Sequence, residues 1–163
     1  MKKMMIALAT STLALAGVSV AHAATFTPAS STINFSGSVD VSKDISLTCT
    51  MTATVATTAL DGSGDNTAAV TAANLTDGLC GLVNFDGFNW PVTVTASSGG
   101  AATELGIAGV EVTTVFGGFC DGDVTVDWTN GSGATLTFPS PTVLDDCEIE
   151  GTLTSTSSAS IAP

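Results

Sequence analysis

Apolar and polar residues alternate along most of the chain after residue 31. In the segment ISLTCTMTATV, every second residue from Ile45 to Val55 is apolar or cysteine, and the residues between them are serine or threonine. A period of two is typical of a strand with one face in the core and one in water. The same alternation predicts strands at residues 90–94, 124–128, 134–138 and 147–153.

Clusters of turn-forming residues separate these segments: DGSGDN at 61–66, SSGG at 97–100, DG at 121–122 and NGSG at 130–133. The last cluster joins two alternating segments and predicts a hairpin. We therefore expect an all-β fold, a single antiparallel β-sandwich or barrel of about eight or nine strands over residues 24–154. Residues 155–163 have little hydrophobicity and are expected to form a flexible C-terminal tail.

The first residues have the pattern of a secretory signal peptide. Lys2 and Lys3 precede an apolar run, and Ala21-His22-Ala23 is a small-x-small cleavage site. Residues 1–23 are therefore expected to be removed during export, which predicts a secreted, extracellular or periplasmic protein. Threonines and serines interrupt the apolar run, and no later stretch approaches the length needed to span a bilayer, so no transmembrane segment is expected after cleavage.

The charge is strongly negative, with 15 Asp and Glu against 3 Lys and Arg and a formal net charge of −12. After signal removal, Lys43 alone would remain against the fifteen acidic residues, a formal charge of −14. Such a surface repels phosphate backbones and anionic lipid headgroups. We therefore expect no nucleic-acid partner, and nucleic-acid binding is the least favoured function.

Four cysteines in an exported chain predict two disulfides. Four cysteines allow three pairings, and we favour Cys49 with Cys80 and Cys120 with Cys147 because both would close local loops of similar size. Each closure would stabilise the fold by about 3 to 4 kcal/mol. The alternative, a metal site, is disfavoured because the chain has no C-x-x-C spacing and its one histidine lies in the signal peptide.

The expected mature chain lacks the usual catalytic side chains. It has no histidine, tyrosine or arginine, which removes histidine-based triads and arginine clamps. Paired carboxylates would permit a glycosidase, but the candidates lie in turns or on the outward phase of strands, which indicates solvated surface. They are Asp121, Asp123, Asp127, Asp145, Asp146, Glu148 and Glu150. We therefore expect no enzyme activity, no catalytic or metal-binding residues and no cofactor.

A calcium loop is the second candidate for acidic chemistry. Asp61, Ser63 and Asp65 have the spacing of the first three ligands of a helix-loop-helix calcium motif. The sixth position, however, is Asn66 where the motif needs glycine, and the twelfth is Ala72 where it needs glutamate. We interpret this segment as a polar turn.

The segment NFDGFN at 84–89 alternates aromatic and turn-forming residues just before a predicted strand. Exposed at a loop tip, Phe85 and Phe88, with Phe116 and Phe119, would form an apolar binding patch. The alternative is that Phe85 and Phe88 fold back over an open end of the sandwich. Trp90 and Trp128 are in the core phase of their strands, which disfavours an aromatic platform for carbohydrate.

Five segments together carry a family resemblance: ATFTP at 24–28, LTC at 47–49, LCGL at 79–82, WPVTV at 90–94 and CEIEGTL at 147–153. In these segments the chain resembles small secreted bacterial proteins called protein activators of alkane oxidation. The resemblance implies a non-enzymatic exported protein that helps bacteria grow on long-chain alkanes, acting at the interface between cell surface and hydrocarbon. Its partners would be hydrocarbon or cell-surface components.

A structural subunit of a surface fibre or pilus is the alternative function. Threonine-rich strand faces almost free of lysine lack the usual protection against edge pairing, so self-association is possible. Residues 32–36, TINFS, would then serve as a donated strand. The chain lacks a tyrosine near its C-terminus, where pilins of the chaperone-usher type commonly have an aromatic residue.

Overall fold

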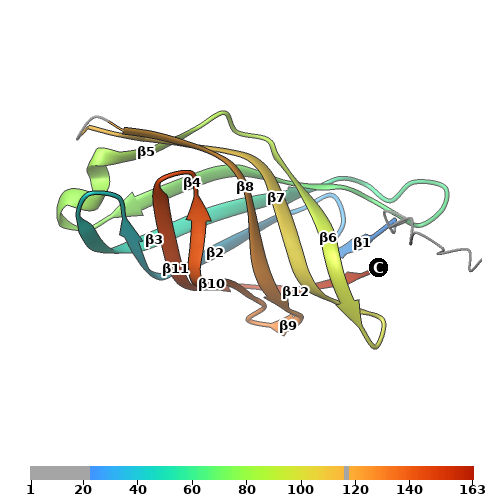
Figure 1. Cartoon of the computed structure of the whole chain (residues 1–163). Coiled ribbons are helices and arrows are strands. Elements are labelled where there is room, and N and C mark those ends of the chain that lie inside the picture. Colours follow the sequence, from blue (N-terminus) through green and yellow to red (C-terminus); the bar gives the residue numbers. More distant parts are fainter. Residues whose placement is uncertain (1–22, 116–117) are drawn as a thin grey trace, which may run out of the picture.

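A computed structural model describes residues 23–115 and 118–163 (Figure 1). The predicted signal peptide lies almost entirely outside the described residues and stays a prediction. Within them the chain forms twelve strands and one short 3-10 helix, in this order: β1 (Thr25–Thr27), β2 (Thr32–Ser42), β3 (Ser46–Thr57), β4 (Ala68–Thr76), η1 (Gly78–Leu82), β5 (Val83–Asp86), β6 (Trp90–Ser98), β7 (Ala101–Thr114), β8 (Gly118–Thr129), β9 (Gly131–Ser132), β10 (Thr135–Leu144), β11 (Cys147–Ser155) and β12 (Ser158–Ala162).

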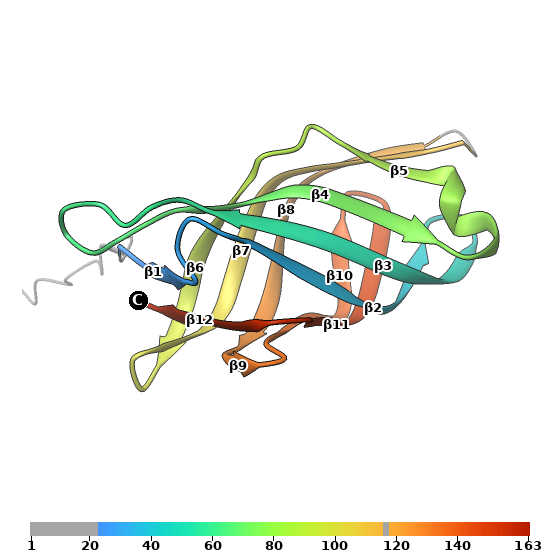
Figure 2. The ribbon, with the colours of Figure 1, turned by 180° about the vertical axis from the view of Figure 1, so that it is seen from behind.

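Eight of these strands close into an antiparallel barrel, which confirms the predicted all-β fold. The hydrogen-bonded order is β7-β6-β4-β3-β2-β11-β10-β8, and β8 pairs with β7 to complete the circle. The ninth strand, β5, pairs with the C-terminal part of β7. Figures 1 and 2 show β2, β3 and β4 running across the barrel and β6, β7 and β8 crossing them on the other side.

Alternation along each strand decides which side chains fill the barrel. In β3, Cys49, Met51, Ala53 and Val55 are buried, whereas the threonines at 48, 50 and 52 are exposed. Trp90 and Trp128 are buried, as their phase predicts. The hairpin expected around NGSG joins β8 to β10, which pair at Thr129 and Thr135.

The segment proposed above as a donated strand lies within β2. This strand pairs with β3 through residues 32–42 and with β11 through residues 35–42. Its backbone hydrogen bonds are therefore made within the chain itself.

The expected flexible tail is corrected by the structure. Residues 158–162 form β12, which pairs with β1 and β9 in a separate three-stranded sheet. Ala159 and Ile161 are buried, and Ile161 is the register partner of the buried Phe26 in β1. Two inward-facing apolar side chains and backbone pairing on both edges hold a segment whose average hydrophobicity is low. We call Phe26, Ala159 and Ile161 the plug.

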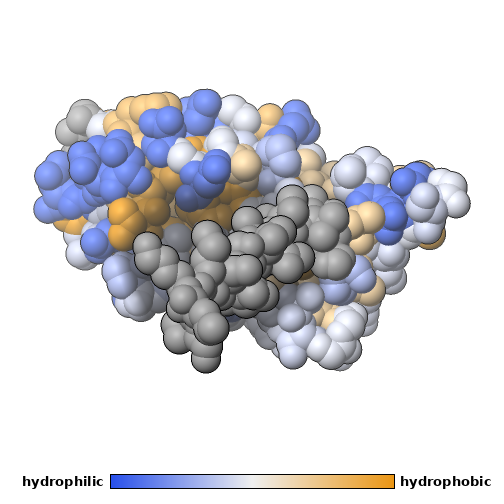
Figure 3. All heavy atoms as spheres, turned by 45° about the vertical axis from the view of Figure 1, so that its right-hand side comes forward, coloured by the Kyte–Doolittle hydropathy of each residue, from blue (hydrophilic) through white to orange (hydrophobic). Residues whose placement is uncertain are grey.

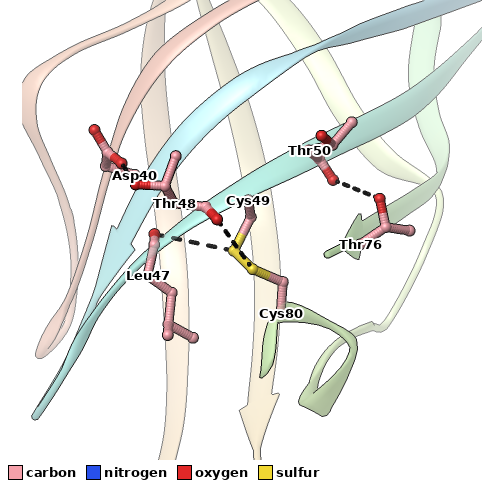
Figure 4. Close-up of a disulfide and its surroundings, with 7 residues drawn as sticks. All are labelled: Asp40, Leu47, Thr48, Cys49, Thr50, Thr76 and Cys80. Carbon is pink, nitrogen blue, oxygen red and sulfur yellow. Dashed lines mark hydrogen bonds between the residues drawn. A yellow bond between two sulfur atoms is a disulfide. The ribbon is translucent and has the colours of Figure 1, made fainter. Parts of the chain in front are cut away.

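Both predicted disulfides are confirmed. Cys49 of β3 is bonded to Cys80 of η1, with a Cα–Cα distance of 5.7 Å (Figure 4). Cys120 of β8 is bonded to Cys147 of β11, with a Cα–Cα distance of 6.1 Å. Both disulfides lie at the same end of the barrel, which is the end that holds the turn between β2 and β3.

Candidate functional site

Three strand turns and η1 gather at one end of the barrel, which we call the mouth end. The turns are β2 to β3 (residues 43–45), β7 to β8, and β10 to β11 (residues 145–146). The pairing of Glu148 with Ser42 brings the turns at 43–45 and 145–146 to one end, and the contacts of Lys43 with Phe119 and Cys120 bring the start of β8 to the same end. In Figure 1 the turn after β2 and helix η1 lie together at the left.

Large exposed hydrophobic side chains gather at the mouth end. Seven such residues occur in the described part of the chain, and Leu60, in the connection from β3 to β4, is the one at the opposite end. The other six define what we call the apolar rim: Ile45, Leu79, Leu82, Val115, Phe119 and Val143. They come from five separate segments of the sequence, and their exposed fractions run from 37% for Leu82 to 60% for Val115.

A cavity of about 350 Å³ occupies the barrel interior and reaches the surface at the mouth end. All eight barrel strands and β5 contribute side chains to its wall. The wall is aliphatic or aromatic along most of its length, for example at Met51, Val70 and Phe138. Its polar residues all lie at the mouth end: Ser42, Lys43, Asp44, Thr114 and Glu148.

The floor of the cavity is formed by Val55, Val70, Ile107 and Leu136. These four side chains also line a second cavity of about 30 Å³, whose other wall includes Phe26 and Ile161 of the plug. The barrel is thus filled by side chains at the plug end and hollow toward the mouth end.

Lys43 reaches from the turn after β2 to the start of β8. Its Nζ donates to the carbonyl oxygen of Phe119 at 3.4 Å and lies 3.5 Å from Sγ of Cys120. Its side chain lies against Gly118, where an added Cβ would come within 2.8 Å of the lysine Cε. Both polar contacts are with uncharged atoms, and Lys43 lines the cavity at its mouth.

Of the carboxylates considered for glycosidase chemistry, Glu148 lines the mouth of the cavity, and the other six do not line it. All are exposed except Glu150, which is half-buried. Figure 3 shows both hydrophilic and hydrophobic residues at the surface of the face that it draws. Across residues 23–115 and 118–163, no cluster of three or more His, Cys, Asp or Glu side chains is arranged to hold a metal ion.

The calcium-like segment forms a polar turn, as interpreted from the sequence. Oδ1 of Asp61 accepts hydrogen bonds from the backbone N–H of Ser63 at 2.8 Å and of Asp65 at 3.0 Å. These backbone donors, that of Asp65 first, lower the pKa of the Asp61 carboxyl below its usual value.

The four phenylalanines of the predicted patch are divided by the structure. Phe85 lines the cavity and Phe88 packs on Trp90, with ring centroids 4.9 Å apart. Phe85 also contacts Trp90, at 5.9 Å between centroids. Phe119 faces outward and is 51% exposed, so it belongs to the apolar rim. Phe116 lies outside the described residues.

Sequence reasoning did not find the cavity or the complete rim. Alternation identifies inward side chains, but it does not say whether they meet across the barrel. A signal for the rim does exist, because Ile45, Leu79 and Leu82 are apolar residues in turns and a short helix, where polar residues are usual.

Comparison with known proteins identifies the family. Residues 1–163 match the family described as alkane oxidation protein activator PraA/PraB-like. The chain belongs to this family. No curated protein and no solved structure gives a significant match. Membership agrees with the resemblance seen in the sequence, and the family description names an activator rather than a catalyst. Within the described residues, no helix has both the length and the apolar character needed to cross a membrane.

Proposed function

We propose that the protein is an exported, non-catalytic factor that aids bacterial use of long-chain hydrocarbons by adsorbing at the boundary between water and hydrocarbon. The observation that carries this proposal is the apolar rim. Six of the seven large exposed hydrophobic side chains of the described residues surround one end of the barrel, where an apolar cavity opens. An apolar surface concentrated in this way is the usual mark of an interaction site.

The negative charge of the protein favours an uncharged partner surface for the apolar rim. The chain has 15 acidic residues against 3 basic ones, so an anionic lipid surface repels it. A hydrocarbon surface carries no such headgroups. The same charge keeps the molecules apart in water despite the exposed apolar side chains.

Adsorption of the purified protein, residues 24–163, to a hexadecane–water interface tests the proposal. The rim variant carries Leu79→Ser, Phe119→Ser and Val143→Ser. Burying a half-exposed aliphatic or aromatic side chain contributes about 1 kcal/mol, so the triple variant is expected to need about a hundredfold higher concentration to lower interfacial tension equally. Leu60→Ser is the matched control, because Leu60 has the same 51% exposure as Phe119 but lies at the other end.

Equal adsorption of the rim variant and the original protein would refute the role of the rim. Surface activity no greater than that of an ordinary globular protein would refute the proposal as a whole. In cells, deletion of the gene should impair growth on hexadecane but not on succinate, and added protein should restore growth while the rim variant should not.

A further inference from the structure

We propose that the interior of the barrel is a binding site for a single unbranched alkyl chain, which enters at the mouth end. This site is argued from the cavity and stands apart from adsorption by the rim. Its volume of about 350 Å³ falls within the range of roughly 300 to 1,000 Å³ that small-molecule sites occupy.

The cavity is long in one direction. Along β3 alone its wall extends from Leu47 to Val55, which corresponds to roughly 26 Å of strand at about 3.3 Å per residue. It ends at the floor, where Val55 and Leu136 separate it from the plug. A cavity that runs lengthwise from the mouth to a closed floor suits a linear chain better than a compact ring system.

The wall offers no polar partner below the mouth. The indole N–H of Trp90, the one side-chain N–H donor in the deeper part of the described wall, donates to the carbonyl oxygen of Asp86 at 3.1 Å. A polar group moved into this interior would lose its hydrogen bonds to water without replacement, whereas methylene groups gain by leaving water. The interior therefore selects the hydrocarbon part of a ligand.

A ligand headgroup would stay at the mouth, beside Lys43, Ser42 and Glu148. Lys43 favours a carboxylate, but Asp44 and Glu148 line the same opening and oppose it. An alkane and a fatty acid both supply the alkyl chain that the cavity would bind. Experiments with one probe of each kind distinguish these two ligands.

Quenching of tryptophan fluorescence by brominated probes tests the site, because bromine quenches at short range. The probes are terminally brominated hexadecane and terminally brominated hexadecanoic acid, below their aggregation limits. Trp90 lines the large cavity, whereas Trp128 lines only the small cavity behind the floor. In the Trp128→Phe protein, we expect saturable quenching of Trp90 at one probe per chain. In the Trp90→Phe protein, Trp128 should keep its emission.

A pair of substitutions on β4 blocks or spares the cavity. Ala73 is half-buried and lines it, while the neighbouring Ala72 is exposed on the outer face. Ala73→Phe should weaken probe binding at least tenfold, and Ala72→Phe should leave it unchanged. Circular dichroism checks that each variant is folded. Ala53→Leu is a second blocking variant, because buried Ala53 also lines the cavity.

Absence of quenching of Trp90 by both probes would overturn the proposal, as would equal binding by the Ala73→Phe, Ala53→Leu and Ala72→Phe proteins. Tighter binding of the acid, lost in Lys43→Met and weakened by salt, identifies a fatty acid. Tighter binding of the bromoalkane, unchanged in Lys43→Met, identifies an alkane. The rim variant should bind probes normally and Ala73→Phe should adsorb normally, so the two proposals fail separately.

Discussion

At the scale of single residues, two asparagines hold the plug in the barrel. Oδ1 of Asn66 accepts the backbone N–H of Phe26 at 2.6 Å, and its Nδ2 donates to the carbonyl oxygen of Phe26 at 3.0 Å. Asn130 makes the same two hydrogen bonds with Ile161: its Oδ1 accepts from the backbone N–H at 2.7 Å, and its Nδ2 donates to the carbonyl oxygen at 3.3 Å. Phe26 and Ile161 are register partners, so each terminal strand is tied to the barrel through an amide side chain.

Replacing Asn66 by Leu is expected to lower the free energy of unfolding by about 1 to 3 kcal/mol. The substitution leaves the buried N–H and carbonyl of Phe26 without their side-chain partners. Urea unfolding of the purified protein measures the change. Asn74→Leu is the control, because Asn74 is exposed on β4 and should shift stability by no more than about 0.5 kcal/mol. Equal shifts for the two variants would contradict a role for Asn66 in holding the plug.

At the scale of elements, β7 shows why periodicity alone is an incomplete guide. It is the longest strand and pairs with β5, β6 and β8, yet its inward residues do not follow a period of two. The buried positions Leu105, Ile107, Val110 and Val112 change phase between Ile107 and Val110, where the pairing with β8 slips. A bulge inserts an extra residue, so the inward positions before and after it are out of phase. A search for strict alternation therefore does not detect the whole strand.

The element β12 stabilises the barrel although its sequence predicts a tail. Ile161→Ala removes a buried side chain from the plug and is expected to cost about 2 to 5 kcal/mol of unfolding free energy. Ser160→Ala, at the exposed neighbouring position, should cost less than about 0.5 kcal/mol. Thermal and urea unfolding compare the two. If the segment were a tail in solution, both substitutions would leave the midpoint unchanged.

At the scale of the whole molecule, a closed barrel separates two kinds of apolar surface. Inward side chains form the core and the cavity wall, and the six residues of the apolar rim remain outside at one end. The exposed carboxylates provide the repulsion that keeps such molecules from associating through their rims. Solubility therefore depends on the ionisation of the carboxylates.

Lowering the pH should make the protein of residues 24–163 self-associate reversibly near its isoelectric point. That point lies below the value of about 4.1 for the full chain, because this protein lacks Lys2, Lys3 and His22. Protonation of Asp and Glu removes the net charge while the rim stays exposed. Light scattering across the range from about pH 7 to about pH 3 should show monomers at the upper end and a steep rise below about pH 4. The rim variant should scatter less at the same pH. Monodisperse protein throughout would contradict this account.

The sequence by itself determined the all-β class, the inward and outward faces of five barrel strands and the hairpin at 130–133, and it favoured the disulfide pairing that the structure has. These features are local, because they depend on alternation along one strand, on turn residues, or on short loops between cysteines. The same information located Phe119 as an apolar surface residue, but it grouped that residue with Phe85, which faces the interior.

Only the tertiary structure decided that the sheet closes, that β12 plugs one end, and that the interior is hollow behind the mouth. The cavity wall combines Leu47, Trp90, Val124 and Leu136, which are far apart in the sequence and meet only through strand order and register. A void is the difference between the volume that eight tilted strands enclose and the volume that their inward side chains fill. That difference depends on the assembled barrel, so it cannot be predicted from any single segment of the chain.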